Sequence, residues 1–400
     1  MKDLKHLIYF EKLLDNAYNE LVEQAKNDGK LAIGYTCFHM PEVLLNLDNC
    51  FSVRMRAPKT GSMDIATYYM TNMTCEYCRA ILERATEGGY NFLDAIAGVD
   101  ACAVMNRCME NIEVQRLIDK EKFFVSHIDV PYKVDQFSVP HYQEQIEIKV
   151  LNPLKKNYGV DISDNAIRKA VAEQNEISRI ITEIGDLRKE DNPPVTGYEF
   201  HILNLVSYVC PKYLIKDKLQ ETLEEIKARM PDSDYKKKYR ARVVIVGSEV
   251  DDPDLTKLVE ESGALIVADR FCFGSFPGRQ VIELTDEESA LTQVCRRYME
   301  DSQCPRYVSH DKIEQRRNFA EQLVKEYKAD GIIYEQLKFC DYWSYERALT
   351  SHIMTEERGI PTLSIDRPYN SRTSGQLRTR FQAFVESLEI KKIQRAKGGN

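Results

Sequence analysis

Short apolar runs alternate with amphipathic segments along most of this chain, and this alternation limits the possible folds more than any other feature. The apolar runs are 30–36, 92–101, 121–130, the two ends of 241–271, 328–339 and 359–366. Runs of this length without polar alternation are typical of parallel strands that are buried on both faces. Helical segments separate them, so the sequence predicts parallel sheets covered by helices on both faces.

The middle of the chain follows a different pattern. Helical periodicity dominates 164–187 and 217–230, and the breaker DNPPVTGYEF (191–200) separates these two segments. We therefore predict an α/β protein with two Rossmann-like parallel-sheet domains and a helical middle segment. The predicted boundaries are 1–142 for the N-terminal α/β domain, 143–238 for the helical segment and 239–400 for the C-terminal α/β domain.

Charge and hydropathy exclude several classes of protein. The net charge is −8 and the basic residues are interspersed with acidic ones, so we expect no nucleic-acid partner. No apolar run approaches the length of a membrane helix, and the N-terminal 30 residues form a charged amphipathic pattern that differs from a signal peptide. We expect a cytoplasmic protein with no membrane partner.

Cysteines follow several of the predicted strands. The chain has 11 cysteines, and Cys37, Cys102, Cys272 and Cys340 come at or just after strand ends, while Cys75 precedes a predicted helix. In open α/β sheets, ligands bind beyond the carboxyl ends of the strands. A helix N-terminus also lowers the pKa of a thiol and favours a bound anion. Any one of these cysteines could simply be a small buried residue, but five in such places favour a shared site.

The spacing of these cysteines separates the possible sites. A structural zinc site needs paired Cys or Cys/His knuckles, which the seven histidines and the single Cys-x-x-Cys do not provide. A redox pair of Cys75 and Cys78 stays possible. Thiolates drawn from distant parts of the chain, near helix N-termini, suit an iron–sulfur cluster best.

Several motifs resemble one family when they are taken in order. GYTCFHMPEVLL (34–45) resembles the opening element of the 2-hydroxyacyl-CoA dehydratases and class I benzoyl-CoA reductases, to which the double-cubane cluster proteins are related. CEYCR (75–79), CAVMNRCME (102–110) and KFCDYW (338–343) are similar to the ligand elements of this family. Two longer stretches, 243–275 and 366–384, resemble the family's recurrent C-terminal elements. This resemblance implies that Cys75, Cys102 and Cys340 bind the cluster, and it places Arg79 on the family's basic residue.

The resemblance also implies a chemistry and a set of partners. Three thiolates would hold a [4Fe-4S] cluster with one open iron, and one low-potential electron would turn a CoA thioester into a ketyl radical. The partners implied are a related or identical second subunit, an acyl-CoA substrate and a separate ATP-hydrolysing iron–sulfur activator protein. No Gly-x-x-x-x-Gly-Lys-Ser/Thr loop exists in this sequence to bind nucleotide.

Departures from the family pattern affect the substrate contacts more than the cluster. Phe38, Val43 and Ala103 stand where family members often have Ser, Glu and Asp. Cys78 replaces a small or apolar residue, and we expect it to pack against the next helical turn without binding iron.

Two alternatives remain open at this point. One is a reductase of small molecules with a double-cubane [8Fe-9S] cluster, which would recruit further thiols such as Cys37, Cys272 or Cys304. The other is a non-catalytic partner subunit whose cluster only relays electrons.

Overall fold

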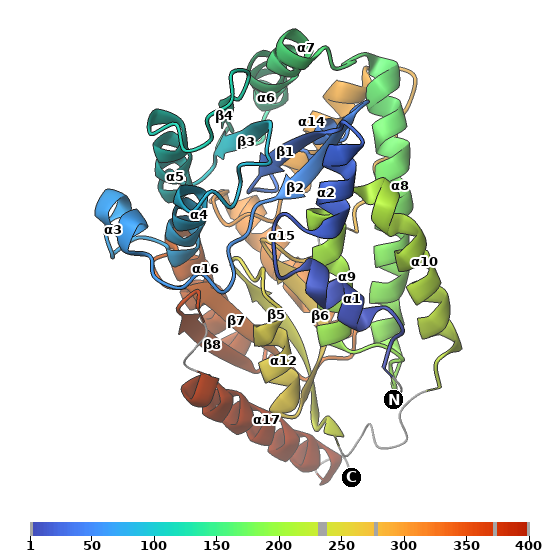
Figure 1. Ribbon diagram of the computed structural model, residues 1–400. Coiled ribbons are helices and arrows are strands. Elements are labelled where there is room, and N and C mark those ends of the chain that lie inside the picture. The colour runs from blue at the N-terminus through green and yellow to red at the C-terminus, as the bar shows by residue number, and fades with distance from the viewer. Residues whose placement is uncertain (1–2, 231–237, 276–278, 371–373, 398–400) are drawn as a thin grey trace.

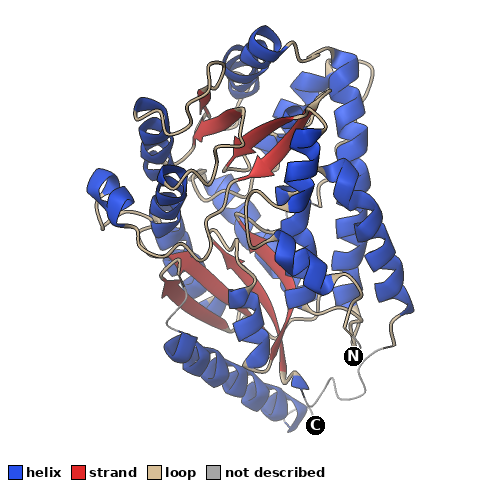
Figure 2. Ribbon diagram, viewed as in Figure 1, coloured by secondary structure: helices blue, strands red, loops and turns tan. Residues whose placement is uncertain are grey.

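Two four-stranded parallel sheets form the core of the protein, as Figures 1 and 2 show. The structure is a computed structural model that describes residues 3–230, 238–275, 279–370 and 374–397. Helices cover both faces of each sheet. The α/β class predicted from the alternation of apolar runs is therefore confirmed.

The first sheet has the strand order β2-β1-β3-β4. Its strands are β1 (Leu31–Tyr35), β2 (Cys50–Arg54), β3 (Ala95–Asp100) and β4 (Val125–Asp129). The helices on one face are α2 (Glu20–Asn27), α3 (Asp64–Met70), α4 (Glu76–Thr86) and α5 (Ala103–Val114). The other face is covered by α6 (Ser138–Ile146), the π-helical turn η2 (Glu147–Leu151) and α7 (Asn152–Tyr158). The 3₁₀ helix η1 (Glu42–Leu45) connects β1 to β2.

The sequence analysis missed β2. This strand reads CFSVR, and its Ser and Arg interrupt the apolar pattern on which the prediction depended. All five residues are nevertheless buried, because Ser52 donates to Glu42 (3.0 Å) and Arg54 reaches backbone carbonyls. A buried strand whose polar groups are hydrogen-bonded need not have an apolar sequence.

The second sheet repeats this topology with the order β6-β5-β7-β8. Its strands are β5 (Ala241–Gly247), β6 (Ala264–Phe271), β7 (Gly331–Leu337) and β8 (Thr362–Arg367). One face is covered by α12 (Asp254–Glu261) and α17 (Ser374–Lys397), and the other by α15 (His310–Glu326) and α16 (Asp341–Glu356). All four strands lie in segments that the sequence predicted.

A helical layer flanks both sheets along one side of the molecule (Figure 1). It consists of α1 (Leu7–Leu13), α8 (Asp164–Asp186), the 3₁₀ helix η3 (Leu187–Lys189), α9 (Gly197–Val209) and α10 (Lys212–Ala228). The described part of 143–238 contains no strand, as the helical periodicity predicted. Within the described residues, no helix is both long and apolar enough to cross a bilayer.

One helix crosses between the predicted domains. Although α14 (Ala290–Glu300) lies in the C-terminal third of the chain, its buried side chains Val294, Tyr298 and Met299 join the core of the first sheet. The boundaries at 142 and 238 stay a prediction. The position of α14 shows that the C-terminal segment contributes to both cores.

The carboxyl ends of the two sheets face one another, and two buried arginines connect them. Arg54, at the end of β2, donates to the carbonyl oxygen of Cys272 (2.6 Å), which follows β6. Arg56 donates to the carbonyl oxygen of Asp251 (2.6 and 2.9 Å), in the loop after β5. Loops from both sheets therefore meet at one junction, where ligands bind in open α/β folds.

Close packing at this junction leaves no room for a side chain at Gly247, the last residue of β5. A Cβ atom there would lie 2.4 Å from Glu335 Oε2 and 2.7 Å from its carbonyl oxygen. We expect Gly247→Ala to lower the free energy of unfolding by about 1–3 kcal/mol through overpacking. Urea unfolding measures this change. Gly61→Ala is the control, because nothing lies within 4 Å of its Cβ position; equal effects of the two substitutions would contradict the prediction.

Candidate functional site

The three predicted ligand cysteines each occupy the N-cap of a helix. Cys75 caps α4, Cys102 caps α5 and Cys340 caps α16. Cys102 and Cys340 also come shortly after the ends of β3 and β7, so they lie at the junction where the carboxyl ends of the two sheets meet. The backbone N–H groups at a helix start are free to bond an anion, and the helix dipole favours negative charge there.

These three thiols come from both sheets but lie within electrostatic reach of one another. The charges of Cys75 and Cys102 both act on the Cys340 thiol. Burial is the larger influence on Cys340 and raises its pKa well above the ordinary value. The structure therefore brings together the three residues that the sequence resemblance singled out.

Cys78 belongs to the same group of thiols. Its side chain is 2% exposed and hydrogen-bonds with the thiols of Cys102 and Cys75. Both bonds raise the pKa of Cys78 well above its ordinary value. The bond between Cys78 and Cys102 also lowers the pKa of Cys102 to about 7. Backbone N–H groups of Met105 and Val104 add to the lowering at Cys102. Cys102 is thus the thiol that ionises most readily among those whose pKa is shifted.

Arg79, the basic residue of the Cys75 motif, hydrogen-bonds with neighbouring segments of the chain. Its guanidinium group donates to the Thr67 hydroxyl (3.1 Å) and to the carbonyl oxygen of Asn72 (3.4 Å), which ties α4 to α3 and to the loop before Cys75. Glu76 lies 3.8 Å away and pairs with its charge. Arg79 therefore holds the segment that presents Cys75.

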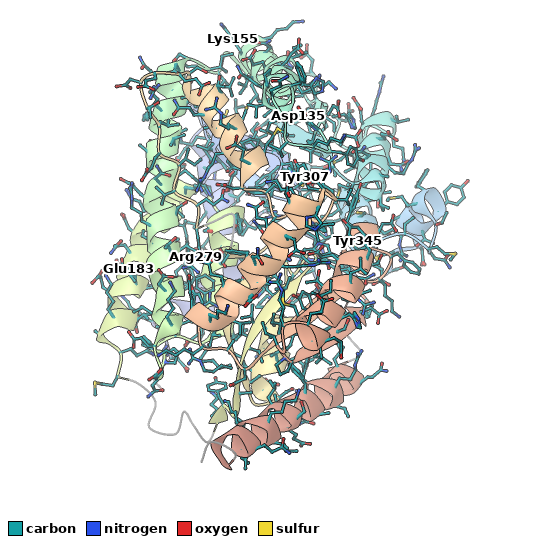
Figure 3. The ribbon with its side chains drawn as sticks, turned by 180° about the vertical axis from the view of Figure 1, so that it is seen from behind. Asp135, Lys155, Glu183, Arg279, Tyr307 and Tyr345 are labelled. Carbon is teal, nitrogen blue, oxygen red and sulfur yellow. The ribbon has the colours of Figure 1, made fainter. Side chains whose placement is uncertain are left out.

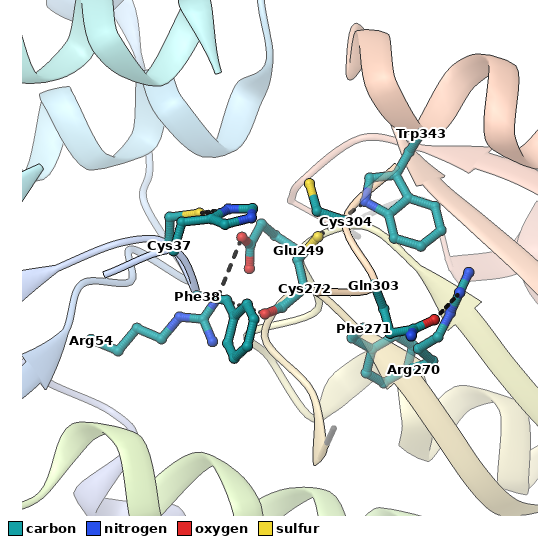
Figure 4. A pocket seen from close by; sticks show the side chains of 11 residues that line it. Cys37, Phe38, Arg54, Glu249, Arg270, Phe271, Cys272, Gln303, Cys304 and Trp343 are labelled. Carbon is teal, nitrogen blue, oxygen red and sulfur yellow. Dashed lines mark hydrogen bonds and ion pairs between the residues drawn. The ribbon is translucent and has the colours of Figure 1, made fainter. Parts of the chain in front are cut away.

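A second group of thiols lines a small pocket between the two sheets, shown in Figure 4. Cys37 follows β1, Cys272 follows β6 and Cys304 follows α14. The Trp343 indole N–H donates to Cys272 Sγ (3.0 Å), and His39 Nδ1 lies 3.5 Å from Cys37 Sγ. Cys304 acts electrostatically on Cys37 and Cys272, so these three thiols also lie close together.

The two groups of thiols are neighbours. A negative charge on Cys340 would act on Cys272, and a negative charge on Cys102 would act on Cys304. Burial raises the pKa of Cys37 to about 12 and that of Cys272 well above the ordinary value. The second group is therefore protonated at neutral pH in the protein as described, and its members need a positively charged partner to ionise.

Arg54 and Glu249 lie close together beside the second group, with the arginine buried and the glutamate partly exposed. Arg54 Nη2 lies 3.6 Å from Glu249 Oε1, and Glu249 follows β5 in the same way that the cysteines follow their strands. Burial raises the pKa of Glu249 to about 8, against the lowering effect of Arg54. Sequence reasoning missed both residues because it searched the strand ends only for cysteine and histidine.

His39 does not fit a proton donor at neutral pH. Burial lowers its pKa to about 3, and its Nε2 lies 3.0 Å from the Ser302 hydroxyl. Phe38, one of the departures from the family pattern, stacks on Tyr298 with ring centroids 4.8 Å apart. These residues pack the wall of the pocket.

A larger cleft elsewhere is a weaker candidate. It has a volume of about 560 Å³ and lies beside α8 and α15 on the back of the molecule, where Figure 3 labels Arg279. Its charged residues are already paired: Arg279 bonds Asp186 and donates to the Tyr327 hydroxyl (2.8 Å), and Arg297 bonds Asp301 (2.6 Å). No thiol lines it, so the junction between the sheets remains the candidate site.

The donor set at the junction consists of soft thiols, the ligand type that iron–sulfur clusters bind. Within the described residues, no three His, Cys, Asp or Glu side chains are placed around one ion position. In an iron–sulfur cluster each thiolate binds a different iron, so the ligands stand farther apart. Three soft thiols can bind three irons of a cluster, and the helix N-termini beside them favour its negative charge.

Comparison with known proteins adds an independent result. The sequence model of the 2-hydroxyglutaryl-CoA dehydratase D-component matches residues 37–388. The chain is 25% identical over 382 residues to the (R)-phenyllactyl-CoA dehydratase beta subunit of Clostridium sporogenes, covering 95% of this chain and 97% of that protein. It is 24% identical to the (R)-2-hydroxyglutaryl-CoA dehydratase subunit beta of Acidaminococcus fermentans, covering 92% and 95%. It is 22% identical to one of the benzoyl-CoA reductase subunits of Thauera aromatica, covering 79% and 80%.

The raised pKa of Glu249 predicts a pH-dependent stability for the iron-free protein. Stability from its protonated form is fully present below the ordinary carboxyl pKa and is lost as the pH rises through about 8. Glu249→Gln keeps an uncharged side chain, so it should lose less stability than the wild type between pH 5 and pH 9. Urea unfolding across this range measures the difference. Glu144→Gln, at an exposed site, is the control, and parallel profiles for wild type and Glu249→Gln would refute the prediction.

Proposed function

Since this chain belongs to the family of the 2-hydroxyglutaryl-CoA dehydratase D-component, we propose that it is an iron–sulfur subunit of a 2-hydroxyacyl-CoA dehydratase or of a benzoyl-CoA reductase-like enzyme. The observation that carries the proposal is the convergence of Cys75, Cys102 and Cys340 from two sheets at three helix N-termini. A packing role alone explains neither this convergence nor the shared position at helix caps.

The residues of the chain have distinct tasks in this proposal. Cys75, Cys102 and Cys340 hold a [4Fe-4S] cluster, which supplies one low-potential electron for ketyl chemistry on a CoA thioester when it is bound. The N-termini of α4, α5 and α16 offset the negative charge of the thiolates. Arg54 and Arg56 fix the loops of the second sheet against the first, so that Cys340 stays opposite Cys75 and Cys102.

The proposal includes partners. The similar proteins are named as beta subunits of dehydratases or as a subunit of benzoyl-CoA reductase, which supports assembly of this chain with a second, related subunit. The sequence contains no Walker-type phosphate loop. We therefore assign ATP hydrolysis to a separate iron–sulfur activator protein that delivers the electron, and we assign an acyl-CoA as substrate.

A second candidate function rests on the second group of thiols. Cys37, Cys272 and Cys304 face Cys102 and Cys340 across the same junction. Six thiols in two neighbouring groups of three could hold a double-cubane cluster, and the enzyme would then reduce small molecules. The Trp343 N–H bond to Cys272 Sγ favours this candidate, because such bonds stabilise a thiolate ligand.

Loss of any one predicted ligand should release iron. Cys75→Ser, Cys102→Ser and Cys340→Ser should each bind less iron than the wild type after anaerobic reconstitution, because a cubane with two thiolates is poorly held. Iron and sulfide analysis with the visible spectrum measures this. Cys295→Ser, a buried thiol on α14, is the control. Unchanged iron in any one of the three variants would remove that residue from the ligand set.

The same analysis of the wild type separates the two candidates. About four irons per chain support a single cubane, and about eight support the double cubane.

Activity should depend on an ATP-driven reductant. We expect the chain with its companion subunit to leave (R)-phenyllactyl-CoA and (R)-2-hydroxyglutaryl-CoA unchanged until the activator, ATP and a reductant are added under anaerobic conditions. The reason is that the electron must arrive at very low potential and the chain has no nucleotide-binding loop. Product formation followed by mass spectrometry tests this, and steady turnover in air without ATP would overturn the proposal.

A further inference from the structure

Arg306 carries a buried positive charge that no carboxylate balances in the described part of the chain. The residue is 1% exposed. Its Nη2 donates to the carbonyl oxygen of Val130 (2.9 Å), while Nε and Nη1 have no hydrogen-bond partner among the described residues. The ring of Tyr132 lies against the guanidinium group, with 4.1 Å between its centroid and Cζ. A carbonyl oxygen and a ring attract a cation but carry no net negative charge, so the charge of Arg306 is not compensated.

The other buried arginines of the described residues have the partners that Arg306 lacks. Arg56 donates with all three side-chain nitrogens to carbonyl oxygens. Those that pair with a carboxylate are Arg54, Arg79, Arg188, Arg270, Arg316 and Arg367.

Arg188 is the closest match to Arg306 in its surroundings. It is also 1% exposed, and its guanidinium group lies over the Phe200 ring (3.7 Å), but it pairs with Asp269 (3.4 Å). A buried guanidinium group without an anion destabilises a protein. A chain that nevertheless has one, beside a candidate site, therefore points to an anion that binds there.

Arg306 lies where the segments that carry the thiols meet. It comes two residues after Cys304, which lines the pocket between the sheets. The Tyr132 hydroxyl lies 3.4 Å from that of Tyr342, which comes two residues after Cys340. Arg306 and its ring partner therefore connect the loop after β4 to the helix start that carries Cys340. Burial raises the pKa of Cys304, and the charge of Arg306 opposes that rise.

We propose that Arg306 is the fixed positive charge that compensates an anionic iron–sulfur cluster at this junction and makes the cluster easier to reduce. This inference rests on the proposed function, because the thiolate-bound cluster is the anion. Reduction adds one electron, which the activator supplies, and it forms or breaks no bond. Arg306 stabilises the reduced form more than the oxidised form, since its attraction grows with the negative charge and is strong at low dielectric.

The first test uses the iron-free chain. Arg306→Gln removes the charge and can still donate to the carbonyl oxygen of Val130. We expect this variant to resist urea at least as well as the wild type, because it lacks the uncompensated buried charge. Arg188→Gln is the matched control and should unfold at a lower urea concentration, because it leaves Asp269 without its partner. An Arg306→Gln chain that unfolds more easily than the wild type, or does not fold, would show a structural role and overturn the inference.

The second test measures the reduction potential after anaerobic reconstitution with ferrous iron and sulfide. The protein is titrated with titanium(III) citrate, which gives up the electron, and electron paramagnetic resonance follows the reduced form. We expect a more negative potential in Arg306→Gln than in the wild type, and potentials close to that of the wild type in Arg306→Lys, which keeps the charge, and in Arg188→Gln.

The outcomes separate this inference from the proposed function. An unchanged potential in Arg306→Gln would overturn the inference and leave the proposed function intact. A folded Arg306→Gln that binds no cluster, where Arg306→Lys binds one, would support the inference, because the cluster then depends on the charge. A wild type that assembles no cluster would overturn both.

Discussion

Two buried arginines hold the carboxyl edges of the two sheets together, and the candidate site depends on that junction. Arg54 and Arg56 extend from the end of β2 to backbone carbonyls that follow β6 and β5. A buried guanidinium group is costly unless its donors are bonded, and carbonyl acceptors at fixed positions allow little sliding. The same contacts therefore orient one sheet against the other and bring the cysteines of both within reach.

The thiols at the junction are subject to opposing effects on ionisation. Burial raises a thiol pKa, whereas helix N-termini and hydrogen-bond donors lower it. Hydrogen-bond donors have the larger effect at Cys102, whose pKa is lowered because the Cys78 thiol and two backbone N–H groups bond its sulfur. Burial has the larger effect at Cys340 and Cys272, and it raises the pKa of both thiols. In the proposed function, iron would bind here with release of protons and would supply the positive charge that these buried thiolates need.

The alternation of apolar runs was sufficient to predict the α/β class and seven of the eight strands found in the described residues, because strands buried on both faces must be apolar unless their polar groups are bonded. It failed for β2, where Ser52 bonds Glu42 in the preceding connection and Arg54 bonds Cys272 in a distant part of the chain. It also could not place α14, since an amphipathic helix shows that it has an apolar face but not which sheet that face covers.

The sequence by itself determined which residues have the chemistry for the site. Strand ends and helix starts singled out five cysteines, and the resemblance of the motifs around them to one family reduced these to Cys75, Cys102 and Cys340 as predicted ligands. Only the tertiary structure decided which further groups join them, because contacts between loops of two sheets leave no periodic trace in a sequence. The position of Cys78 between two other thiols, the second group around Cys272, and the pairing of Glu249 with Arg54 all depend on that packing.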